Sequence, residues 1–459
     1  MKIIILGASQ VGCSMTEVLV AEGNDITLVD INSSLLTQLQ HRLDIRTIVG
    51  HAAYPSVLEQ AGAEDADLIL AVTDSDEVNM SACQIADIQF NTPTKIARIR
   101  SPEYLKNLSL FAKDSGMKID VVISPEQILT NHISRLIEYP GSKQVLDFAD
   151  GLVQLVGMKV FPEGPLVSKR VGDMSKHVQG TETRIAAIYR GKNVITPKSS
   201  TVFQAHDEVF FVAARKNILK VMSMMRDKHI KVKRVILAGG GNIGVNLAKT
   251  LEQKGLSVKI IEKDPHRART IADQLSTAVV LNGDAADVEL LQQENIDGTC
   301  VFCAITQSDE TNILSAMVAK QMGADRVMAL VNRSVYLDKL KHKDIDVIIS
   351  PKVATTGSIL AHIRRGDVAA VHSLRLGLAE AIEAVAHGDA ESSRVVGENV
   401  RDLKLPPGTG VGAIVRNQQV LMPTKDVVIE PEDHVILFMV DKQYIHEVEK
   451  LFQVDVSFL

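Results

Sequence analysis

Two glycine-rich segments are the residues of this chain with the clearest chemical potential. The segment GASQVG from Gly7 follows the apolar run KIIIL, and GGGNIG from Gly239 follows RVILA. In a strand–turn–helix unit, the first glycine permits the tight turn and a middle glycine lets a pyrophosphate approach the backbone. N–H groups at the start of the helix then face the phosphates. The expected contacts are Gly7, Ala8, Ser9, Gln10 and Val11 in one segment and Gly239, Gly240, Gly241, Asn242 and Ile243 in the other.

Each glycine segment is followed by a carboxylate at the end of the next predicted strand. Asp30 comes eighteen residues after Gly12, and Glu262 comes eighteen residues after Gly244. Such a carboxylate accepts hydrogen bonds from ribose hydroxyls and repels a 2′-phosphate. The pairing favours NAD(H) or another adenine nucleotide over NADP(H). The alternative is that both glycine turns serve only the fold.

Further residues are expected at the carboxyl edge of the same sheets, where ligands of such folds bind. Gly50 and Gly283 follow the third strands, where a small residue leaves space for adenine. Thr73 and Thr306 end the fourth strands, beside the crevice. Arg98 ends the next strand of the first copy, where a cation could contact a phosphate.

The two copies differ at two of these positions. Ser9 stands where the second copy has Gly241, and its hydroxyl could donate to a phosphate oxygen. At the fifth strand we expect Val331 opposite Arg98, so that only Arg333 remains as a cation in the second copy. The two sites therefore need not prefer the same ligand.

These differences are visible because the chain is an internal duplication. The segment TDSDEVN from Thr73 matches TQSDETN from Thr306, and Ile123-Ser-Pro125 matches Ile349-Ser-Pro351. Shared order over about half the chain, with small changes of offset, indicates two whole modules and not a solenoid.

Each module is expected to have two parts. Continuous β-branched runs such as ADLILAVT and TCVFCAIT, separated by amphipathic stretches, predict a doubly wound, Rossmann-like parallel sheet. A shorter, strand-rich α+β domain follows each sheet. The expected fold class is thus α/β with two tandem Rossmann-like sheets. The predicted boundaries are 1–140 and 141–225 for the first module, 226–232 for a linker, and 233–366 and 367–459 for the second.

Composition narrows the class of protein. The formal net charge is −6, so no overall basic field attracts nucleic acid. Four cysteines in 459 residues are too few for a disulfide scaffold and fit a reducing compartment. No run of about 18 apolar residues predicts a membrane-spanning helix. We therefore expect a cytosolic chain that reaches a membrane only through a partner.

The sequence offers no persuasive catalytic set. Cys300 and Cys303 have redox-motif spacing, but in a strand such residues face opposite sides, so we expect core cysteines. The histidines show neither an HExxH motif nor zinc spacing, and no metal site is predicted. The second domains lack an acid–base group to work on a nicotinamide. We expect a nucleotide sensor and no enzyme; an NAD-dependent oxidoreductase or quinone reductase is the alternative, and a redox-sensing repressor is less favoured.

The glycine turns, their acids and the repeated TxSDExN segments together resemble the tandem RCK family, which regulates potassium conductance in bacterial Trk uptake systems. The resemblance covers the whole chain. It implies a homo-oligomer, a tetramer, forming a gating ring on the inner face of the cell membrane beneath an integral-membrane potassium transporter of the TrkH or TrkG type. It implies binding of NAD(H) and of ATP or ADP. It also adds Asp74 and Asp284 to the ligand-binding residues.

Overall fold

The computed structural model describes the chain except residues 113–115, 175–182, 192, 226–230, 298–299, 334, 337–339, 341–344, 364–367, 376–377, 424–425 and 455–459, and except the side chains of Cys300 and Lys442. The chain forms two compact units. The first contains Met1–Ile128 and Ala354–Ile363, and the second contains Leu129–Val353 and Arg364–Leu459. The domain boundaries expected from the sequence stay predictions.

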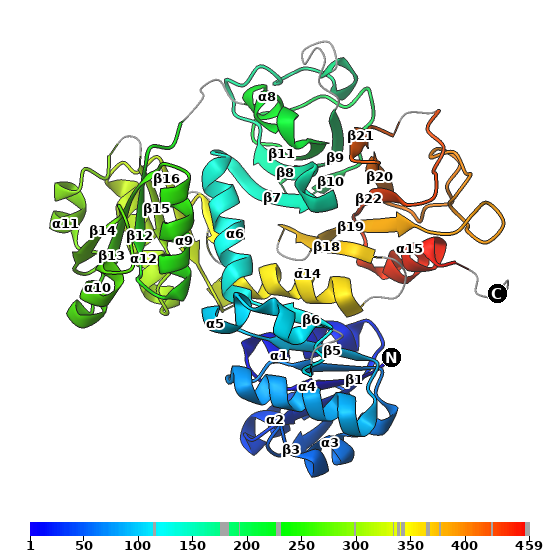
Figure 1. The fold of residues 1–459 in the computed structure, drawn as a ribbon. Coiled ribbons are helices and arrows are strands. Elements are labelled where there is room, and N and C mark those ends of the chain that lie inside the picture. Colours follow the sequence, from blue (N-terminus) through cyan, green and yellow to red (C-terminus); the bar gives the residue numbers. More distant parts are fainter. Residues whose placement is uncertain are drawn as a thin grey trace. The chain divides into compact units, whose positions relative to one another are not determined.

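The first unit is built around a six-stranded parallel sheet in the order β3-β2-β1-β4-β5-β6, drawn in blue and cyan in Figure 1. Its buried strands are rich in isoleucine, leucine and valine, as a sheet covered on both faces requires. The strands alternate with helices. The elements are β1 Lys2–Leu6, α1 Gln10–Ala21, β2 Asp25–Asp30, α2 Ser33–Gln40, β3 Arg46–Val49, α3 Pro55–Ala61, β4 Leu68–Ala71, α4 Asp76–Phe90, β5 Thr94–Arg98, α5 Pro102–Leu105 and β6 Val121–Ile123.

The second unit contains the repeat of this sheet, in the order β14-β13-β12-β15-β16-β17. The expected fold class is therefore confirmed: two doubly wound sheets, each followed by a smaller sheet. The elements are β12 Arg234–Ala238, α9 Asn242–Gln253, β13 Ser257–Glu262, α10 Pro265–Ala272, β14 Val279–Asn282, α11 Val288–Gln293, β15 Cys300–Ala304, α12 Asp309–Gln321, β16 Arg326–Leu330 and β17 Val347–Ile349. The helix after each sixth strand is long: α6 spans Pro125–Glu138 and α14 spans Pro351–Ile363.

Each smaller sheet has five antiparallel strands, and in the described part of the chain a short helix follows the last of these strands. Their orders are β10-β9-β11-β8-β7 and β18-β19-β22-β20-β21. The elements are β7 Ser142–Phe148, β8 Val153–Lys159, β9 Thr183–Arg190, β10 Asn193–Ile195, β11 Glu208–Ala214 and α8 Ile218–Ser223, then β18 Val368–Leu374, β19 Ala379–Ala386, β20 Thr409–Arg416, β21 Gln419–Leu421, β22 Asp433–Met439 and α15 Ile445–Phe452.

The same buried ion pair stabilises both smaller sheets. Arg190 donates from Nε and Nη2 to the two carboxylate oxygens of Asp207, each at 2.9 Å. Arg416 makes the same two-pronged contact with Asp433, at 2.8 and 2.7 Å. Both aspartates are fully buried, so each carboxylate needs this partner. A single hydrophobic cluster, containing Phe210 and Phe438 among others, joins the two sheets within the second unit.

A buried arginine ties α6 to the second parallel sheet. Arg326, at the start of β16, donates to the backbone carbonyls of Leu136, Tyr139 and Ser142, and its side chain is almost fully buried. The last carbonyls of a helix have no partner within the helix, and a cation there satisfies them and complements the helix dipole. One side chain of the second copy thus completes a helix that belongs to the first.

The TxSDExN segment of each copy connects the ends of two neighbouring strands, the fourth and the fifth. Asn79, fully buried on α4, accepts from Thr73 N at 2.9 Å and from its hydroxyl at 2.7 Å, and donates to the carbonyls of Thr73 and Arg98. Asn312 repeats all four hydrogen bonds with Thr306 and Leu330.

The aspartate of SDExN binds the backbone directly after the fifth strand. Asp76 accepts from the N–H groups of Arg100 and Ser101, and Asp309 accepts from those of Asn332 and Arg333. The segment therefore holds the ends of the fourth and fifth strands at the carboxyl edge of each sheet.

These matched bonds correct one expectation. Asn79 donates to the carbonyl of Arg98 and Asn312 to that of Leu330, so Leu330 and not Val331 stands opposite Arg98. In the same register Arg333 matches Ser101. Val331 is a fully buried core residue. Since Leu330 is also uncharged, the second copy still has no arginine at the position of Arg98.

We predict that Asn79→Ala lowers the free energy of unfolding by about 2–4 kcal/mol, because several buried backbone and hydroxyl groups lose their partner. The control is Asn193→Ala, which alters an exposed asparagine. Urea unfolding of the full chain, followed by circular dichroism, measures the difference. Equal midpoints for the two variants would contradict a fastening role.

Candidate functional site

Both glycine turns have the backbone geometry that the sequence predicts. Gly7 has φ +103° and Gly239 has φ +118°, a region that residues with a side chain rarely adopt. A Cβ on Gly12 would collide with the carbonyl oxygen of Gly7, and one on Gly244 with that of Gly239. The first and third glycines of each turn are thus required by the protein itself, so that the helix can start directly over the strand.

The two acids hold the turns in place. Asp30 Oδ2 accepts from Ala8 N at 2.6 Å, and Glu262 Oε2 accepts from Gly240 N at 2.9 Å. The other oxygen of each carboxylate accepts from the backbone two residues further along, at Asn32 and Asp264. Both acids are half-buried, and each carboxylate oxygen has a further lone pair beside the one that accepts from the backbone. A ribose would therefore meet a carboxylate that is already oriented.

The middle position of the turn distinguishes the copies. Ser9 is the N-cap of α1: its hydroxyl donates to the carbonyl of Val72 at 2.9 Å and accepts from Gly12 N. The expectation that this hydroxyl donates to a phosphate is wrong for the conformation described, because its hydrogen is already used. Gly241 precedes α9 without any side-chain cap, and a Cβ there would meet nothing within 4 Å.

Helix packing explains why glycine is needed at Gly50 and Gly283, in addition to the expected space for adenine. A Cβ at Gly50 would lie 2.7 Å from Val57 Cγ2, and one at Gly283 would lie 2.7 Å from Leu290 Cδ2. Each glycine thus lets the following helix approach the third strand. Both also donate a backbone hydrogen bond at 3.0 Å to the carbonyl of the acid, Asp30 or Glu262. Each follows the third strand of its sheet, and its contact with adenine stays a prediction.

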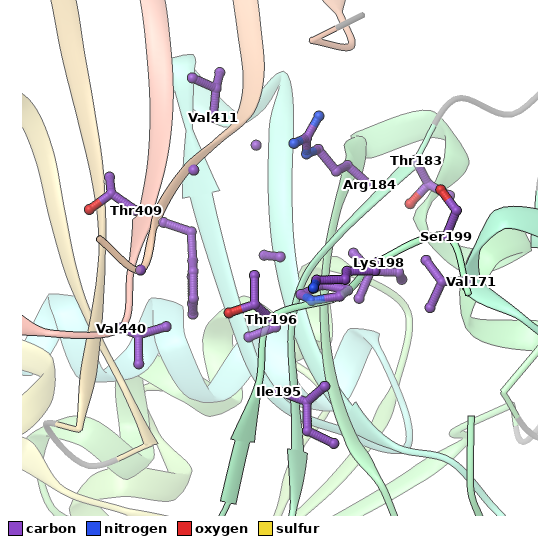
Figure 2. Close-up of a pocket in the computed structure, with 18 of the residues that line it drawn as sticks. Val171, Thr183, Arg184, Ile195, Thr196, Lys198, Ser199, Thr409, Val411 and Val440 are labelled. Carbon is purple, nitrogen blue, oxygen red and sulfur yellow. The ribbon is translucent and has the colours of Figure 1, made fainter. Parts of the chain in front are cut away.

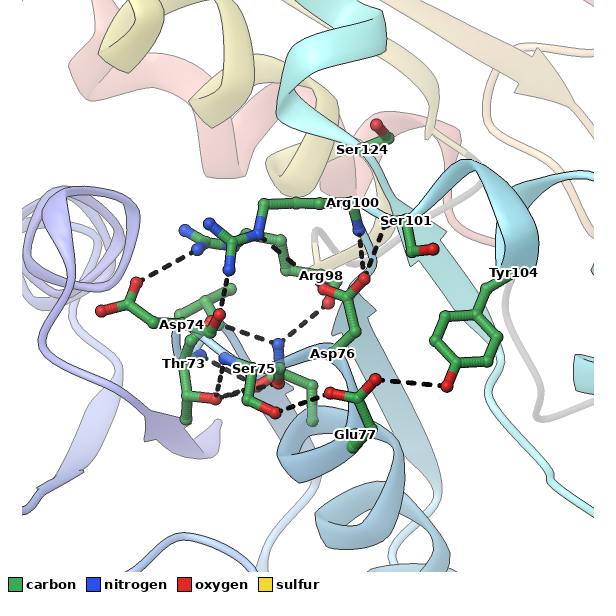
Figure 3. A network of polar contacts seen from close by, with 12 residues as sticks. Thr73, Asp74, Ser75, Asp76, Glu77, Arg98, Arg100, Ser101, Tyr104 and Ser124 are labelled. Atoms are coloured by element: carbon green, nitrogen blue, oxygen red, sulfur yellow. Dashed lines mark hydrogen bonds and ion pairs between the residues drawn. The ribbon is translucent and has the colours of Figure 1, made fainter. Parts of the chain in front are cut away.

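Two arginines, Arg98 and Arg100, lie beside Asp74 and Asp76 at the end of β5 in the first unit (Figure 3). Arg98 has a side chain that is 9% exposed, and its one ion-pair partner among the described residues is Asp74, at 3.3 Å, whose carboxylate is 90% exposed. Its Nε is buried without a hydrogen-bond partner in this structure. Burial, and then the neighbouring Arg100, lower the pKa of Arg98. An anion placed here would pair with a cation that the fold itself leaves poorly neutralised.

The corresponding edge of the second unit is apolar at the strand end and charged elsewhere. Leu330 replaces the buried arginine, while Asp284 pairs with exposed Lys263 at 3.2 Å. The N–H of Ala286, followed by Lys263, keeps the pKa of Asp284 below its usual range. Arg267 donates to the carbonyl of Gly240 at 2.8 Å, which further orders the turn.

The predicted residues are brought together in each unit, and sequence reasoning missed the residues that hold them there. Asp30 contacts Ala8 and Gly50, the backbone of Gly7 packs directly against Thr73, and Asp74 pairs with Arg98. The missed residues are the asparagine and the aspartate of SDExN, which are Asn79, Asn312, Asp76 and Asp309. The signal was present, because the segment recurs in both copies.

A cavity of about 510 Å³ lies elsewhere, between the two smaller sheets (Figure 2). It is lined by β9, β10 and β20, with Arg184 and Lys198 as its charged groups. None of the predicted nucleotide-binding residues reaches it. Both cations are exposed, and Arg184 donates to the carbonyl of Pro423.

The described residues also bear on two other kinds of site, a metal centre and a reactive cysteine. Across the described residues, no group of three or more histidine, cysteine, aspartate or glutamate side chains is placed to hold a metal. Cys303 is fully buried, and burial raises its pKa to about 12, as expected of a core cysteine; the Cys300 side chain lies outside the described part. Within that part, no helix is long and apolar enough to cross a membrane.

Comparisons with known proteins agree with this architecture. The family model described as TrkA-N domain matches residues 3–125 and 235–351, and the TrkA-C domain model matches 155–226 and 389–453. The Trk system potassium uptake protein TrkA of Halomonas elongata is 52% identical over 458 residues, and that of Vibrio alginolyticus is 50% identical over 459. Both matches cover 100% of each chain.

A solved structure shares the fold. The GsuK channel bound to NAD superposes with a TM-score of 0.61 at 18% identity, covering 98% of this chain and 78% of that one. The domain matches and the full-length identity decide the family. This chain belongs to the TrkA family of Trk-system potassium uptake proteins.

Proposed function

We propose that this chain is the nucleotide-sensing regulatory subunit of a potassium-uptake system. The full-length identity to proteins named for potassium uptake supports this role. In the proposal the chain is cytoplasmic and attaches to the inner face of the membrane through an integral-membrane transporter subunit of the TrkH or TrkG type. It regulates that partner and is not itself an enzyme.

The proposed effectors are NAD(H) and ATP or ADP, bound at the two glycine turns. The observation that carries this proposal is Gly241. Its φ is −69°, so the turn does not require glycine there, and a Cβ would meet no atom of the chain. The absent side chain leaves the backbone of this turn open to the approach of a ligand. The neighbouring carboxylate of Glu262 and the uncapped start of α9 suit a ribose and a pyrophosphate. The GsuK channel of the same fold is described as bound to NAD.

We further propose that the two modules have different preferences. The first offers the buried cation Arg98 beside a capped helix, and the second offers open backbone beside Leu330. A ligand with more phosphate charge, such as a triphosphate, gains more at the first. Which module takes NAD(H) is left to the measurement.

Regulation then follows from linkage. A nucleotide shifts a conformational equilibrium only by its differential affinity for the two states. Two sites per chain, multiplied by assembly into a tetrameric gating ring, give several coupled binding events for one change in the transporter.

The proposal is tested by adding nucleotides to the purified chain together with its membrane partner. We expect NADH and ATP each to change potassium conductance, and NADH absorbance to remain constant throughout. Sustained loss of that absorbance with a small carbonyl or quinone substrate would favour the oxidoreductase instead. Conductance that ignores both nucleotides would refute the sensing role.

Gly241→Val isolates the second turn. A Cβ at this position meets open space, and the backbone angles at Gly241 are ones that valine adopts. We therefore expect a free energy of unfolding within about 0.5 kcal/mol of that of the parent chain. The number of nucleotide sites found by calorimetric titration should fall from two to one. Gly410→Val, in a strand where a Cβ also meets nothing, is the control and should keep both sites. Two sites remaining in Gly241→Val would show that the ligand does not approach this turn.

Arg98→Leu gives the first module the residue that the second has at the same strand end. We expect about tenfold or greater loss of ATP affinity at the first site, because a charge-assisted contact disappears. The remaining binding should also depend less on salt. Arg42→Leu, an exposed arginine of the same unit, is the control. Unchanged ATP affinity and salt dependence would place the phosphates away from β5.

A further inference from the structure

A second cavity in the second unit has the character of an anion site. It has a volume of about 420 Å³ and lies between the β7–β8 end of the first small sheet and the amino-terminal edge of the second parallel sheet. Its apolar wall includes Phe161, Pro162 and Val347. Its charged lining is Lys143, Lys159, Lys320, Arg326, Asp325 and Asp346.

Most of these charges are already neutralised or committed. Lys320 pairs with Asp346 at 2.8 Å, Arg326 is occupied by the carbonyls that end α6, and Asp325 is exposed. The two remaining cations are Lys143 and Lys159. Both are half-buried, and neither has a hydrogen bond or ion pair to the rest of the chain as the structure describes it.

The positive charges of Lys143 and Lys159 repel each other. The charge of Lys159 adds to burial, the main cause, in lowering the pKa of Lys143. Glu208 lies near enough to oppose this, but its carboxylate pairs with Arg375 at 3.3 Å. The carboxylates of Glu208 and Asp346 raise the pKa of Lys143 but form no ion pair with it. The two ammonium groups therefore lose hydration at this cavity without gaining an ion pair, a cost that a bound anion would offset.

The backbone and the repeat both set Lys143 apart. It is the extra residue of a β-bulge, where the β7–β8 register shifts between Ser142 and Gln144. Bulges re-aim a side chain away from the regular alternation of a strand. The second small sheet keeps the bulge between Val368 and Ala370, but it has Ala369 at the matching position and Val385 in place of Lys159. The lysines are therefore additions to a fold that forms without them.

We propose that Lys143 and Lys159 form a binding site for a phosphate group, free or carried by a small metabolite, distinct from both glycine turns. The two ammonium groups bind the anion, and the apolar wall beside them accepts the carbon part of a metabolite. Because the first small sheet and the second parallel sheet both line the cavity, its occupant contacts both.

The test is lysine footprinting of the full chain with inorganic phosphate as the probe. Acetylation of each lysine is timed by mass spectrometry, at constant ionic strength set with chloride. Phosphate should slow acetylation of Lys143 and Lys159 but not of Lys169, an exposed lysine of the same small sheet domain. Equal protection by chloride and phosphate, or equal protection of Lys169, would overturn the proposal.

Variants separate this site from the nucleotide sites. In Lys159→Gln, the phosphate concentration that half-protects Lys143 should rise about tenfold, and Lys159→Arg should restore it. Gly241→Val should leave the protection of Lys143 unchanged, so this result does not depend on nucleotide binding. Protection of Lys143 that is the same in Lys159→Gln as in the parent chain would refute a shared site. If Lys159→Gln does not fold, Lys143→Gln read at Lys159 makes the same comparison.

Discussion

The candidate sites depend on one interaction: the carboxylate at the end of the second strand accepts a hydrogen bond from the N–H of the residue after the first glycine. Asp30 does so for Ala8, and Glu262 for Gly240. The chain leaves the strand with positive φ at Gly7 or Gly239, and the N–H of the next residue, Ala8 or Gly240, then has no partner in regular secondary structure. The acid supplies that partner. It thereby fixes the turn in the conformation in which the helix starts directly after the strand.

Much of this could be predicted from the sequence, because the relevant signals are local. Positive φ and close approach explain why glycine is needed at Gly7 and Gly12, and the spacing to Asp30 follows from one helix and one strand. The parallel sheets follow from continuous apolar runs such as β4. Because the chain is duplicated, each of these signals occurs in both copies.

What could not be predicted depends on partners distant in sequence. The hydroxyl of Ser9 looked free for a phosphate, but it donates to the carbonyl of Val72, 63 residues away. The register of the fifth strands was misjudged because the repeat changes its offset between Asn312 and Leu330, in the segment where α12 ends earlier than its counterpart. Aligning the two copies with one fixed offset misses a shift of one residue. Only the hydrogen bonds of the two asparagines reveal which residues correspond.

The two copies agree where the fold requires it and differ where a ligand would bind. Asn79 and Asn312 make the same four bonds, and Asp207 and Asp433 the same buried ion pairs.

By contrast, three equivalent positions carry different residues in the two copies: Ser9 corresponds to Gly241, Arg98 to Leu330, and Lys143 to Ala369. None of these three differences disturbs a hydrogen bond that both copies share. They change instead the charge, or the room, of a surface at the edge of a sheet or cavity. A chain in which both sites answered one ligand equally could report only its concentration. In the proposed function, divergence at these positions lets the two modules respond to different anions, and a regulator that compares two nucleotides needs that difference in affinity.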